Sequence, residues 1–324
     1  MAGARQPSKV KPGATSEQKS RREQFLRNLS TLQGVTLRND VDHDSPPTEF
    51  QFIKASILRD GVFRADEESI VGCTCHQKYK QQNGCVYLDH CSCIQDSVED
   101  DKGKKFFAYG ASPNNYGLLR KKFLQTRNPI YECNSKCDCD NYCKNRVVQH
   151  GRKIHVEIFK TSDRGWGLRS SEDIQLGQFI DTYRGEIITS QEADRRGKSR
   201  TQEEINNFFF DFDKFEGHLP ENGQAYVCDG RHYGSPARFL NHSCDPNCAI
   251  YTVSYNSSDP YIYELAFFAI EDIPRGTELT FDYYDNDEAM HISDAMAREF
   301  EQEKGYAPTK CLCGSEDCRG YFLH

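Results

Sequence analysis

The densest run of polar side chains in this sequence is Arg238-Phe239-Leu240-Asn241-His242-Ser243-Cys244-Asp245-Pro246-Asn247. An amide, an imidazole, a hydroxyl and a thiol stand on four consecutive residues, and a turn-forming Asp-Pro follows them. Polar groups at this density can be buried only if each finds a hydrogen-bonding partner. Taken alone, the run is as typical of a polar turn with an incidental histidine as of a binding site, so its meaning depends on the rest of the chain.

Other motifs accompany this run. Glu278-Leu279-Thr280-Phe281-Asp282-Tyr283 follows it, Arg164-Gly165-Trp166-Gly167 precedes it, and cysteine clusters lie on both sides. Together these motifs resemble the SET-domain protein lysine methyltransferases, in the subclass with pre-SET and post-SET zinc modules. The resemblance covers residues 73–323 and is closest to the suppressor-of-variegation type, in particular the short fungal histone H3 lysine-9 trimethyltransferases. It implies a mainly β fold of small sheets with a threaded segment that brings residues 238–247 under the loop near residues 281–284.

Composition narrows the function classes before any single residue is considered. A chain of 324 residues can form one large or two ordinary domains, and 37% hydrophobic residues with a mean hydropathy of −0.77 indicate a soluble protein. No apolar run is long enough for a membrane span or a signal peptide, so we expect an intracellular protein without membrane contact. A net charge of −8 disfavours nucleic acid as the main ligand and suits a basic partner.

Fifteen cysteines, an odd number, favour metal thiolates over disulfides inside a cell. The first cluster consists of Cys73, Cys75, Cys85, Cys91, Cys93, Cys133, Cys137, Cys139 and Cys143. Tetrahedral zinc needs four ligands, so nine sulfurs serve three ions only if three of them bridge two ions each. Few large apolar residues separate these cysteines, so the metal would replace a hydrophobic core. The alternatives are independent zinc sites, spare thiols, or a DNA-binding zinc cluster, which Asp138 and Asp140 disfavour.

A second cluster, Cys311, Cys313 and Cys318, is one ligand short of a closed zinc site. The family resemblance supports Cys244 as the fourth ligand. Cys248 and Cys228 are alternatives, although each is also typical of a small buried residue. With Cys244 as ligand, the C-terminal tail would fold back onto the residues around His242, and metal binding would complete the active site.

The domain organisation follows from these clusters and from changes in composition. We predict a disordered basic arm (1–24), an N-terminal bracing segment (25–70), a pre-SET zinc cluster (71–146), a SET catalytic domain (147–284), an acidic connector (285–306) and a post-SET zinc module (307–324). Apolar and β-branched runs predict strands over 154–159, 178–184, 208–212, 261–270 and 278–283. Helical patterns cover 190–207 and 292–300, and the shape of residues 94–132 is left open. For the arm, nuclear import or nucleic-acid contact is an alternative to a solvated tail.

The resemblance assigns catalytic roles to three aromatic residues. The hydroxyl of Tyr283 would sit beside the transferring methyl, orient the attack and help proton loss, and Tyr183 would hydrogen-bond the incoming amine. Phe281 stands where a tyrosine in this family holds a water and limits methylation, so the resemblance predicts di- to trimethylation, with trimethylation favoured. Without the motif context, each could equally be an ordinary core residue.

The resemblance also assigns binding sites for S-adenosylmethionine. Arg164, Gly165, Trp166 and Gly167 would form a loop around its methionine end, where the glycines permit close approach. Asn241 and His242 would hold the adenosyl part, with Arg238 pinning their segment; a proton shuttle is the alternative role for His242. Phe208 replaces the usual tyrosine and lacks its hydroxyl. Because Leu323 occupies the place of the C-terminal aromatic residue, Phe322 or Tyr321 would close over the cofactor.

For the substrate, the resemblance implies the N-terminal tail of histone H3, bound as an added strand beside Asp211 and Asp213. These two aspartates alternate along a predicted strand and so share a face, which suits an arginine beside the target lysine. We therefore expect a zinc-containing, monomeric histone H3 lysine-9 methyltransferase of nuclear chromatin, active in heterochromatin formation and gene silencing, without sequence-specific DNA binding. The alternatives are another histone or non-histone lysine, a catalytically silent SET scaffold, and a zinc-dependent nucleic-acid binder.

Overall fold

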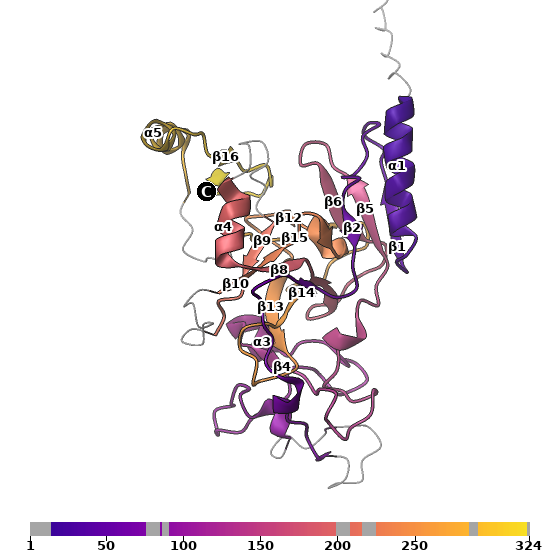
Figure 1. The fold of residues 1–324 in the computed structure, drawn as a ribbon, viewed down its shortest axis with the longest axis vertical. Coiled ribbons are helices and arrows are strands. Elements are labelled where there is room, and N and C mark those ends of the chain that lie inside the picture. Colours follow the sequence, from indigo (N-terminus) through magenta and orange to yellow (C-terminus); the bar gives the residue numbers. More distant parts are fainter. Residues whose placement is uncertain are drawn as a thin grey trace, which may run out of the picture.

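The computed structural model describes residues 14–75, 85, 91–198, 208–215, 225–284 and 291–322. It confirms a mainly β architecture built from small sheets. The cysteine-rich segment forms one end of the molecule, the sheets fill the middle, and α1 and α5 stand on opposite sides of the other end (Figure 1). Among the described helices, none combines the length and apolar character needed to cross a bilayer.

Three sheets of four or five strands make up the middle of the molecule. The first runs in the order β1 (Val35–Arg38), β5 (Val156–Lys160), β6 (Trp166–Ser170), β15 (Glu278–Phe281) and β12 (Asn241–His242). The second runs β3 (Ile57–Leu58), β8 (Glu186–Thr189), β10 (Tyr226–Asp229) and β9 (Phe209–Asp211), and the third β4 (Ile130–Tyr131), β13 (Cys248–Ser254), β14 (Glu264–Ala269) and β7 (Phe179–Tyr183). Two-stranded pairs join β2 (Gln51–Phe52) to β11 (Tyr233–Gly234) and β16 (Thr309–Lys310) to β17 (Tyr321–Phe322).

Helix α1 (Ser16–Leu29) corrects the prediction of a disordered arm up to residue 24, whereas residues 1–13 lie outside the described part. Its first turn is closed by a capping box, in which the Thr15 side chain accepts from Gln18 N and the Gln18 side chain accepts from Thr15 N. Phe25 and Leu29 are buried in the main core. Basic composition suggested a solvated tail, but two apolar residues one helical turn apart suffice to dock this helix.

The segment 25–70 is joined to the larger body by its strands. Each of its three strands pairs in parallel with a strand from much later in the chain. Val35 pairs with Val156, Gln51 with Tyr233, and Ile57 with Glu186. These pairings tie the N-terminal segment to sheets that carry the candidate site.

Two hydrophobic cores lie on either side of the third sheet. The main core includes Phe25, Phe50, Ile158, Phe239 and Phe281, and the second gathers residues of the cysteine-rich half against β13 and β14. The carboxylate of Glu132 joins that half to the next segment, because it accepts hydrogen bonds from the Tyr109 hydroxyl at 2.6 Å and from the Val147 and Val148 amides at 2.8 Å. A buried carboxylate with this many donors is well satisfied.

The remaining helices are short. Helix α3 (Lys121–Thr126) lies in the stretch whose shape the sequence left open, and it buries Phe123 in the second core. Helix α4 (Ser190–Lys198) covers the first half of the predicted 190–207 helix, and residues 199–207 fall outside the described part. Helix α5 (Asp294–Lys304) begins two residues later than predicted and ends at Gly305 in a left-handed conformation, the usual C-terminal cap.

Candidate functional site

The two polar motifs of the sequence meet side by side. Strand β12 runs parallel to β15, with Asn241 opposite Thr280 and His242 opposite Phe281. Beyond the strands, Ser243 N donates to the Phe281 carbonyl at 3.0 Å. The Tyr283 hydroxyl donates to the Leu240 carbonyl at 3.0 Å. The predicted meeting of the 238–247 and 278–283 segments is therefore present in the fold.

A cavity of about 530 Å³ opens where these segments meet. It is lined by Pro47, Arg164, Gly165, Trp166, Tyr183, Phe208, Phe209, Phe210, Ala237, Arg238, Phe239, Leu240, Asn241, Phe281, Tyr283, Tyr284, Thr309 and Phe322. The lining combines polar residues, among them Arg164, Arg238 and Asn241, with tyrosine and phenylalanine rings. Such a cavity suits a ligand with a charged part and a reaction at an apolar wall.

Four aromatic rings form the apolar wall. The Tyr183 and Phe210 ring centroids lie 4.4 Å apart, those of Phe210 and Phe281 5.8 Å, and those of Phe281 and Tyr283 4.7 Å. Burial raises the pKa of Tyr283 to about 12 and that of Tyr183 well above its usual value. Tyr283 is 46% exposed because it faces the open cavity, but its hydroxyl end is enclosed. Both phenols therefore keep their protons at neutral pH.

Arg238 supplies a partly buried positive charge to the lining of the cavity. Its guanidinium lies over the rings of Phe208 at 4.1 Å and Phe50 at 4.9 Å, and its Nε donates to the Gly230 carbonyl at 3.1 Å. Burial lowers its pKa to about 10, so the side chain stays charged at physiological pH. No carboxylate of the described residues pairs with it. A partly buried cation without a counter-ion is a ready partner for an anionic ligand group.

Glu278 joins the two cofactor motifs that the sequence suggested. Its carboxylate accepts from Arg164 Nη2 at 2.6 Å and from Asn241 Nδ2 at 2.8 Å. Gly165 has a φ of +71°, and Gly167 lies so close to Glu278 that a Cβ there would stand 2.7 Å from its Oε1. Of the expected loop, Trp166 and Gly167 instead begin strand β6. The sequence indicated both motifs but gave no role to the carboxylate that connects them.

His242 has both ring nitrogens engaged. Nδ1 accepts from the Tyr283 backbone amide at 3.2 Å, which leaves the proton on Nε2, 3.2 Å from the Cys244 sulfur. Burial lowers the pKa of His242 to about 4, although the nearby Asp282 carboxylate opposes this shift. A neutral imidazole with both nitrogens bonded disfavours the proton-shuttle alternative.

The C-terminal tail folds back onto this site. The sulfurs of Cys244, Cys311, Cys313 and Cys318 all lie within 4.8 Å of one another, a spacing that suits one tetrahedral zinc ion. Cys228 and Cys248, the alternative ligands, are buried in the main core instead. Arg319 donates to Cys244 through its backbone amide at 3.3 Å and to Asp282 through Nη2 at 2.6 Å. These contacts fix the tail against the 278–283 segment.

Of the two candidate closing residues, Phe322 is the one that reaches the cavity. Its ring packs 4.8 Å from His242 and 5.8 Å from Tyr284. The Tyr321 hydroxyl instead donates to Asp294 on α5 at 2.8 Å. Leu323 lies outside the described residues.

Comparison with known proteins identifies the family. The SET domain model matches residues 165–284 and the Pre-SET motif model matches residues 28–146. The H3 lysine-9 specific histone-lysine N-methyltransferase dim-5 of Neurospora crassa is 42% identical over 301 residues, which cover 89% of this chain and 87% of that protein. The chain belongs to the SET-domain histone lysine methyltransferases.

Solved structures of this family agree with the fold. The Neurospora SET domain protein DIM-5, a histone lysine methyltransferase, superimposes with a TM-score of 0.72 at 41% identity, covering 81% of this chain and 99% of that chain. KRYPTONITE, solved with mCHH DNA, an H3(1–15) peptide and SAH, gives a TM-score of 0.64 at 25% identity, covering 89% of this chain and 51% of that chain.

The pre-SET cysteines form a compact sulfur cluster. Three groups of four have their sulfurs within 4.8 Å of one another: Cys73, Cys85, Cys91 and Cys133; Cys73, Cys93, Cys133 and Cys137; and Cys85, Cys133, Cys139 and Cys143. Cys75 lies beside Cys73, Cys85 and Cys91, with which its thiol interacts. If Cys75 takes the place of Cys133 in the first group, every zinc ion has four ligands, and Cys73, Cys85 and Cys133 are the three bridges. The donor set therefore fits the trinuclear cluster.

A guanidinium compensates part of the negative charge of this pre-SET cluster. Arg146 is buried, and its Nη2 donates to the Cys139 sulfur at 3.5 Å and to the Asn134 carbonyl at 2.7 Å. Asn145 Nδ2 donates to the Cys133 sulfur at 3.6 Å. Hydrogen bonds of this kind orient metal ligands and stabilise their thiolate form.

The proposed substrate residues stand on the edge of the second sheet. Asp211 and Asp213 are exposed on one face of the strand and its extension, and the intervening Phe212 is buried. Partial burial and the neighbouring charge of Asp213 raise the pKa of Asp211. Phe208 lies against Arg238 and has no hydroxyl to offer the cavity.

Replacement of Glu278 by glutamine tests the bridge between the cofactor motifs. The amide that replaces one carboxylate oxygen cannot accept a hydrogen bond, so either Arg164 or Asn241 loses its partner. We expect the affinity for S-adenosylhomocysteine to fall about 10-fold, the usual scale for a hydrogen bond to a charged group. Trp166, the single tryptophan, lines the cavity and reports binding by its fluorescence. Glu271→Gln, at an exposed position in the bend after β14, should bind as the wild type does.

Proposed function

We propose that this enzyme transfers methyl groups from S-adenosylmethionine to lysine 9 of histone H3 and that its end product is trimethyl-lysine. The observation that carries the proposal is a single cavity that joins a partly buried cation, Arg238, to a wall of aromatic rings around Tyr283. A charged donor and a lysine side chain need these two environments in one place. The family relatives that act on this histone residue support the choice of lysine, and a chromatin substrate implies a nuclear location.

The donor end fits the charged groups of S-adenosylmethionine. Arg238 is positioned to pair with its carboxylate, and Trp166, Asn241 and Phe322 line the surfaces that its other parts would contact. When bound, S-adenosylmethionine supplies a methyl group that its sulfonium makes electrophilic. The protein's task is therefore to bind, orient and exclude water rather than to activate the methyl group.

The aromatic wall prepares the lysine for attack. A free lysine has a pKa near 10.4, and an apolar channel between Tyr183, Phe210 and Phe281 lowers it by disfavouring the ammonium form. The Tyr283 and Tyr183 hydroxyls donate to the Leu240 and Phe208 carbonyls, which leaves their oxygen lone pairs to accept from the incoming amine. Because both phenols stay protonated at neutral pH, neither serves as the base, and the lysine loses its proton to water before it attacks. The same rings hold the methylated cation through cation–π contacts.

Strand β9 is the part of the second sheet proposed to receive the histone tail. Among the described strands, β9 is the last in the order β3-β8-β10-β9, so its outer edge has no described neighbour. An extended peptide would add to this edge through backbone hydrogen bonds. Asp211 and Asp213 then stand beside it and would attract a basic residue next to the lysine, which a protein of net charge −8 also favours.

The test of this function is methylation of a set of H3 tail peptides in which each lysine in turn is replaced by arginine. We expect every peptide except the lysine-9 replacement to gain up to three methyl groups at one site, measured by mass spectrometry. Methylation that persists in the lysine-9 replacement would identify another target. Binding of S-adenosylmethionine without transfer to any peptide would indicate a silent scaffold.

Phe281 is expected to set the number of methyl groups. Its ring is only 5% exposed and packs 4.8 Å from Phe267 and 4.7 Å from Tyr283. In Phe281→Tyr, the added hydroxyl and any water that it binds occupy space that a dimethylated lysine needs. We expect the amount of trimethyl product to fall about 10-fold or more, the scale of a single steric conflict. The rate of the first methyl transfer should change by less than about 3-fold. A time course by mass spectrometry gives both values, and an unchanged trimethyl fraction would contradict the assignment.

A further inference from the structure

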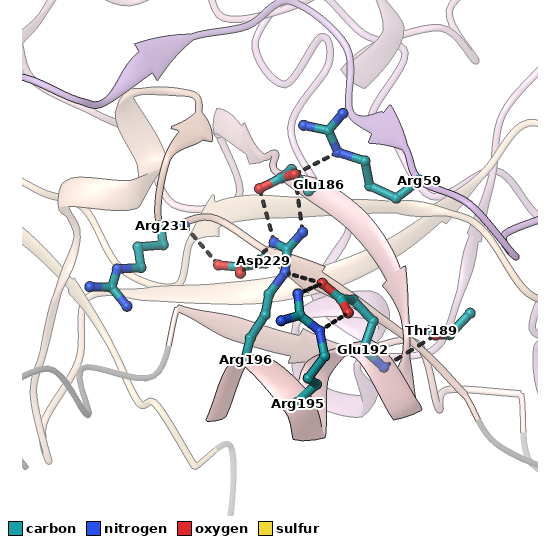
Figure 2. Close-up of polar contacts among 8 residues, drawn as sticks. All are labelled: Arg59, Glu186, Thr189, Glu192, Arg195, Arg196, Asp229 and Arg231. Carbon is teal, nitrogen blue, oxygen red and sulfur yellow. Dashed lines mark hydrogen bonds and ion pairs between the residues drawn. The ribbon is translucent and has the colours of Figure 1, made fainter. Parts of the chain in front are cut away.

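Helix α4 is attached to the back of the second sheet mainly by charged groups (Figure 2). Its one buried residue is Ala193, which packs with Ile188 and Val227. This small apolar contact stabilises the helix weakly. The other contacts with the sheet come from Ser190, whose hydroxyl donates to the Ala225 carbonyl, and from Arg196 in the last turn.

Arg196 connects three carboxylates at once. Its Nη1 donates to Glu186 at 3.0 Å and to Asp229 at 2.9 Å, and its Nε donates to Glu192 at 2.9 Å. The side chains of Glu186 and Asp229 are only 6% and 1% exposed. Burial alone would raise the pKa of Glu186, but hydrogen bonds from Arg196 and Arg59 outweigh it and hold the pKa below its usual value. Two buried carboxylates on adjacent strands therefore share Arg196 as a cationic partner, in addition to Arg59 at Glu186 and the Arg231 amide at Asp229.

Gly230, the residue after Asp229, contacts residues that line the active-site cavity. Gly230 N donates to the Phe208 carbonyl at 3.0 Å, and the Tyr183 hydroxyl donates to that same carbonyl at 2.9 Å. The Gly230 carbonyl accepts from Arg238 Nε at 3.1 Å. A Cβ on Gly230 would lie 2.2 Å from the Tyr183 hydroxyl oxygen, so the backbone here has no room to shift toward the channel.

We propose that Arg196 is a positioning residue for methyl transfer. Arg196 holds the Glu186 and Asp229 side chains together and so fixes the Asp229–Gly230 backbone. That backbone in turn positions the Tyr183 hydroxyl and strand β9. Asp229 pairs in register with both Glu186 on β8 and Phe209 on β9, so a displacement of Asp229 moves the strand to which the histone tail is expected to add. This role rests on the proposed function, because it acts through the lysine channel.

Arg195 provides a matched control on the same helix turn. It donates to Glu192 at 2.6 and 2.7 Å, but among the described residues it has no contact with Glu186 or Asp229, and its side chain is 71% exposed. An exposed pair of this kind contributes little to stability. Figure 2 shows Arg195 over Glu192, whereas Arg196 reaches between Glu186 and Asp229.

The experiment compares Arg196→Met, Arg196→Lys and Arg195→Met in the full chain. For Arg196→Met we expect kcat/KM for an H3 peptide to fall about 10-fold or more, the scale of a displaced catalytic group. Affinity for S-adenosylhomocysteine, read from Trp166 fluorescence, should fall less than kcat/KM, because Gly230 holds Arg238 by one backbone hydrogen bond while the contact between Glu278 and Asn241 is untouched. Arg196→Lys should recover part of the loss, and Arg195→Met should match the wild type.

Dependence on pH separates positioning from a general loss of structure. Glu186 is faced by Arg59, the residue after β3, by Arg196 on α4 and by Asp229 on β10. Asp229 is faced by Arg196, by the backbone amide of Arg231 and by the electrostatic influence of Tyr183 and Arg238. Without Arg196, burial raises the pKa of Glu186, so this carboxyl takes up a proton at a higher pH than in the wild type. The ratio of variant to wild-type kcat/KM should therefore rise as the pH falls from 9 to 6. In the double variant Arg196→Met/Asp229→Asn, one of the two facing carboxylates is removed. The ratio of its kcat/KM to that of the wild type should therefore be higher than for Arg196→Met and should change less with pH.

Hydrogen exchange gives a readout that does not require activity. The amides of residues 208–211 and 226–230 should exchange faster in Arg196→Met and stay at wild-type rates in Arg195→Met, whether or not any peptide is methylated. Equal exchange and equal kcat/KM in the two methionine variants would overturn the role of Arg196. If the wild-type enzyme transfers no methyl group to any H3 peptide, the proposed function is refuted instead. The hydrogen-exchange comparison would still decide the positioning role. If Arg196→Met fails to fold, the same comparison between Arg196→Lys and Arg195→Lys decides it.

Discussion

Replacement of Tyr283 by phenylalanine should lower kcat about 100-fold or more while the enzyme still folds and binds S-adenosylmethionine. The hydroxyl donates to the Leu240 carbonyl at 3.0 Å, so its oxygen is fixed in the lining of the cavity. Without it, one of the two tyrosine oxygens that can accept from the lysine amine is lost at the aromatic wall. The ring remains packed against Phe281 and His242, so cofactor affinity by Trp166 fluorescence should change less than about 3-fold.

Tyr251→Phe is the matched control for this change. The Tyr251 hydroxyl also donates to a backbone carbonyl, that of Leu124 at 3.3 Å, but this residue is fully buried in the second core. We expect its loss to lower thermal stability slightly and to leave kcat unchanged. The kcat of Tyr183→Phe should lie between those of the other two variants, because its hydroxyl lines the same cavity but donates to the Phe208 carbonyl instead of to the 238–247 segment. A Tyr283→Phe enzyme with near wild-type turnover would exclude the proposed role.

The parts of the fold that the sequence predicted are those with a local signal. Strands β7, β14 and β15 lie within predicted apolar runs and β5 ends one residue beyond one, because alternation or continuous burial leaves a visible pattern. Helix α1 was missed because its apolar content is low and docking depends on Phe25 and Leu29 finding a distant core. Tertiary contacts of this kind have no signature in a short window of sequence.

Some residues of the candidate site could likewise be predicted from the sequence and others could not. The motif residues Asn241, His242 and Tyr283 come together as the resemblance implied, because β12 and β15 pair. Glu278 and Arg196 could not be assigned from sequence, since a glutamate beginning a strand or an arginine ending a helix is most often a solvated charge. What distinguishes them is the set of partners that the fold brings within 3 Å, such as Asn241 for Glu278 and Asp229 for Arg196. Such partners are distant in the chain and can be recognised only in the folded protein.

Removal of the post-SET zinc should inactivate the enzyme before the pre-SET cluster is affected. Cys244, Cys313 and Cys318 are partly exposed, whereas most pre-SET cysteines are buried, so a chelator reaches the post-SET ion first. Without this ion the tail loses its main constraint, and with it the Arg319–Asp282 pair and the Phe322 ring over His242. We expect cofactor affinity and kcat each to fall about 10- to 100-fold, the usual cost of disturbing a metal site's surroundings. Zinc measured by mass spectrometry should drop from four ions to three, and added zinc should restore activity.

Two cysteine variants decide which sulfur completes that site. Cys244→Ser should reproduce the chelated state, with three zinc ions and the same loss of affinity, because its sulfur lies with those of Cys311, Cys313 and Cys318. Cys248→Ser should keep four ions and most of its activity, since Cys248 is buried in the main core and its thiol donates to Asn247 Oδ1, a bond that serine can retain. A three-zinc enzyme with full turnover would mean that the tail holds its place without the metal. Loss of zinc from Cys248→Ser, with four ions retained in Cys244→Ser, would transfer the ligand role to Cys248.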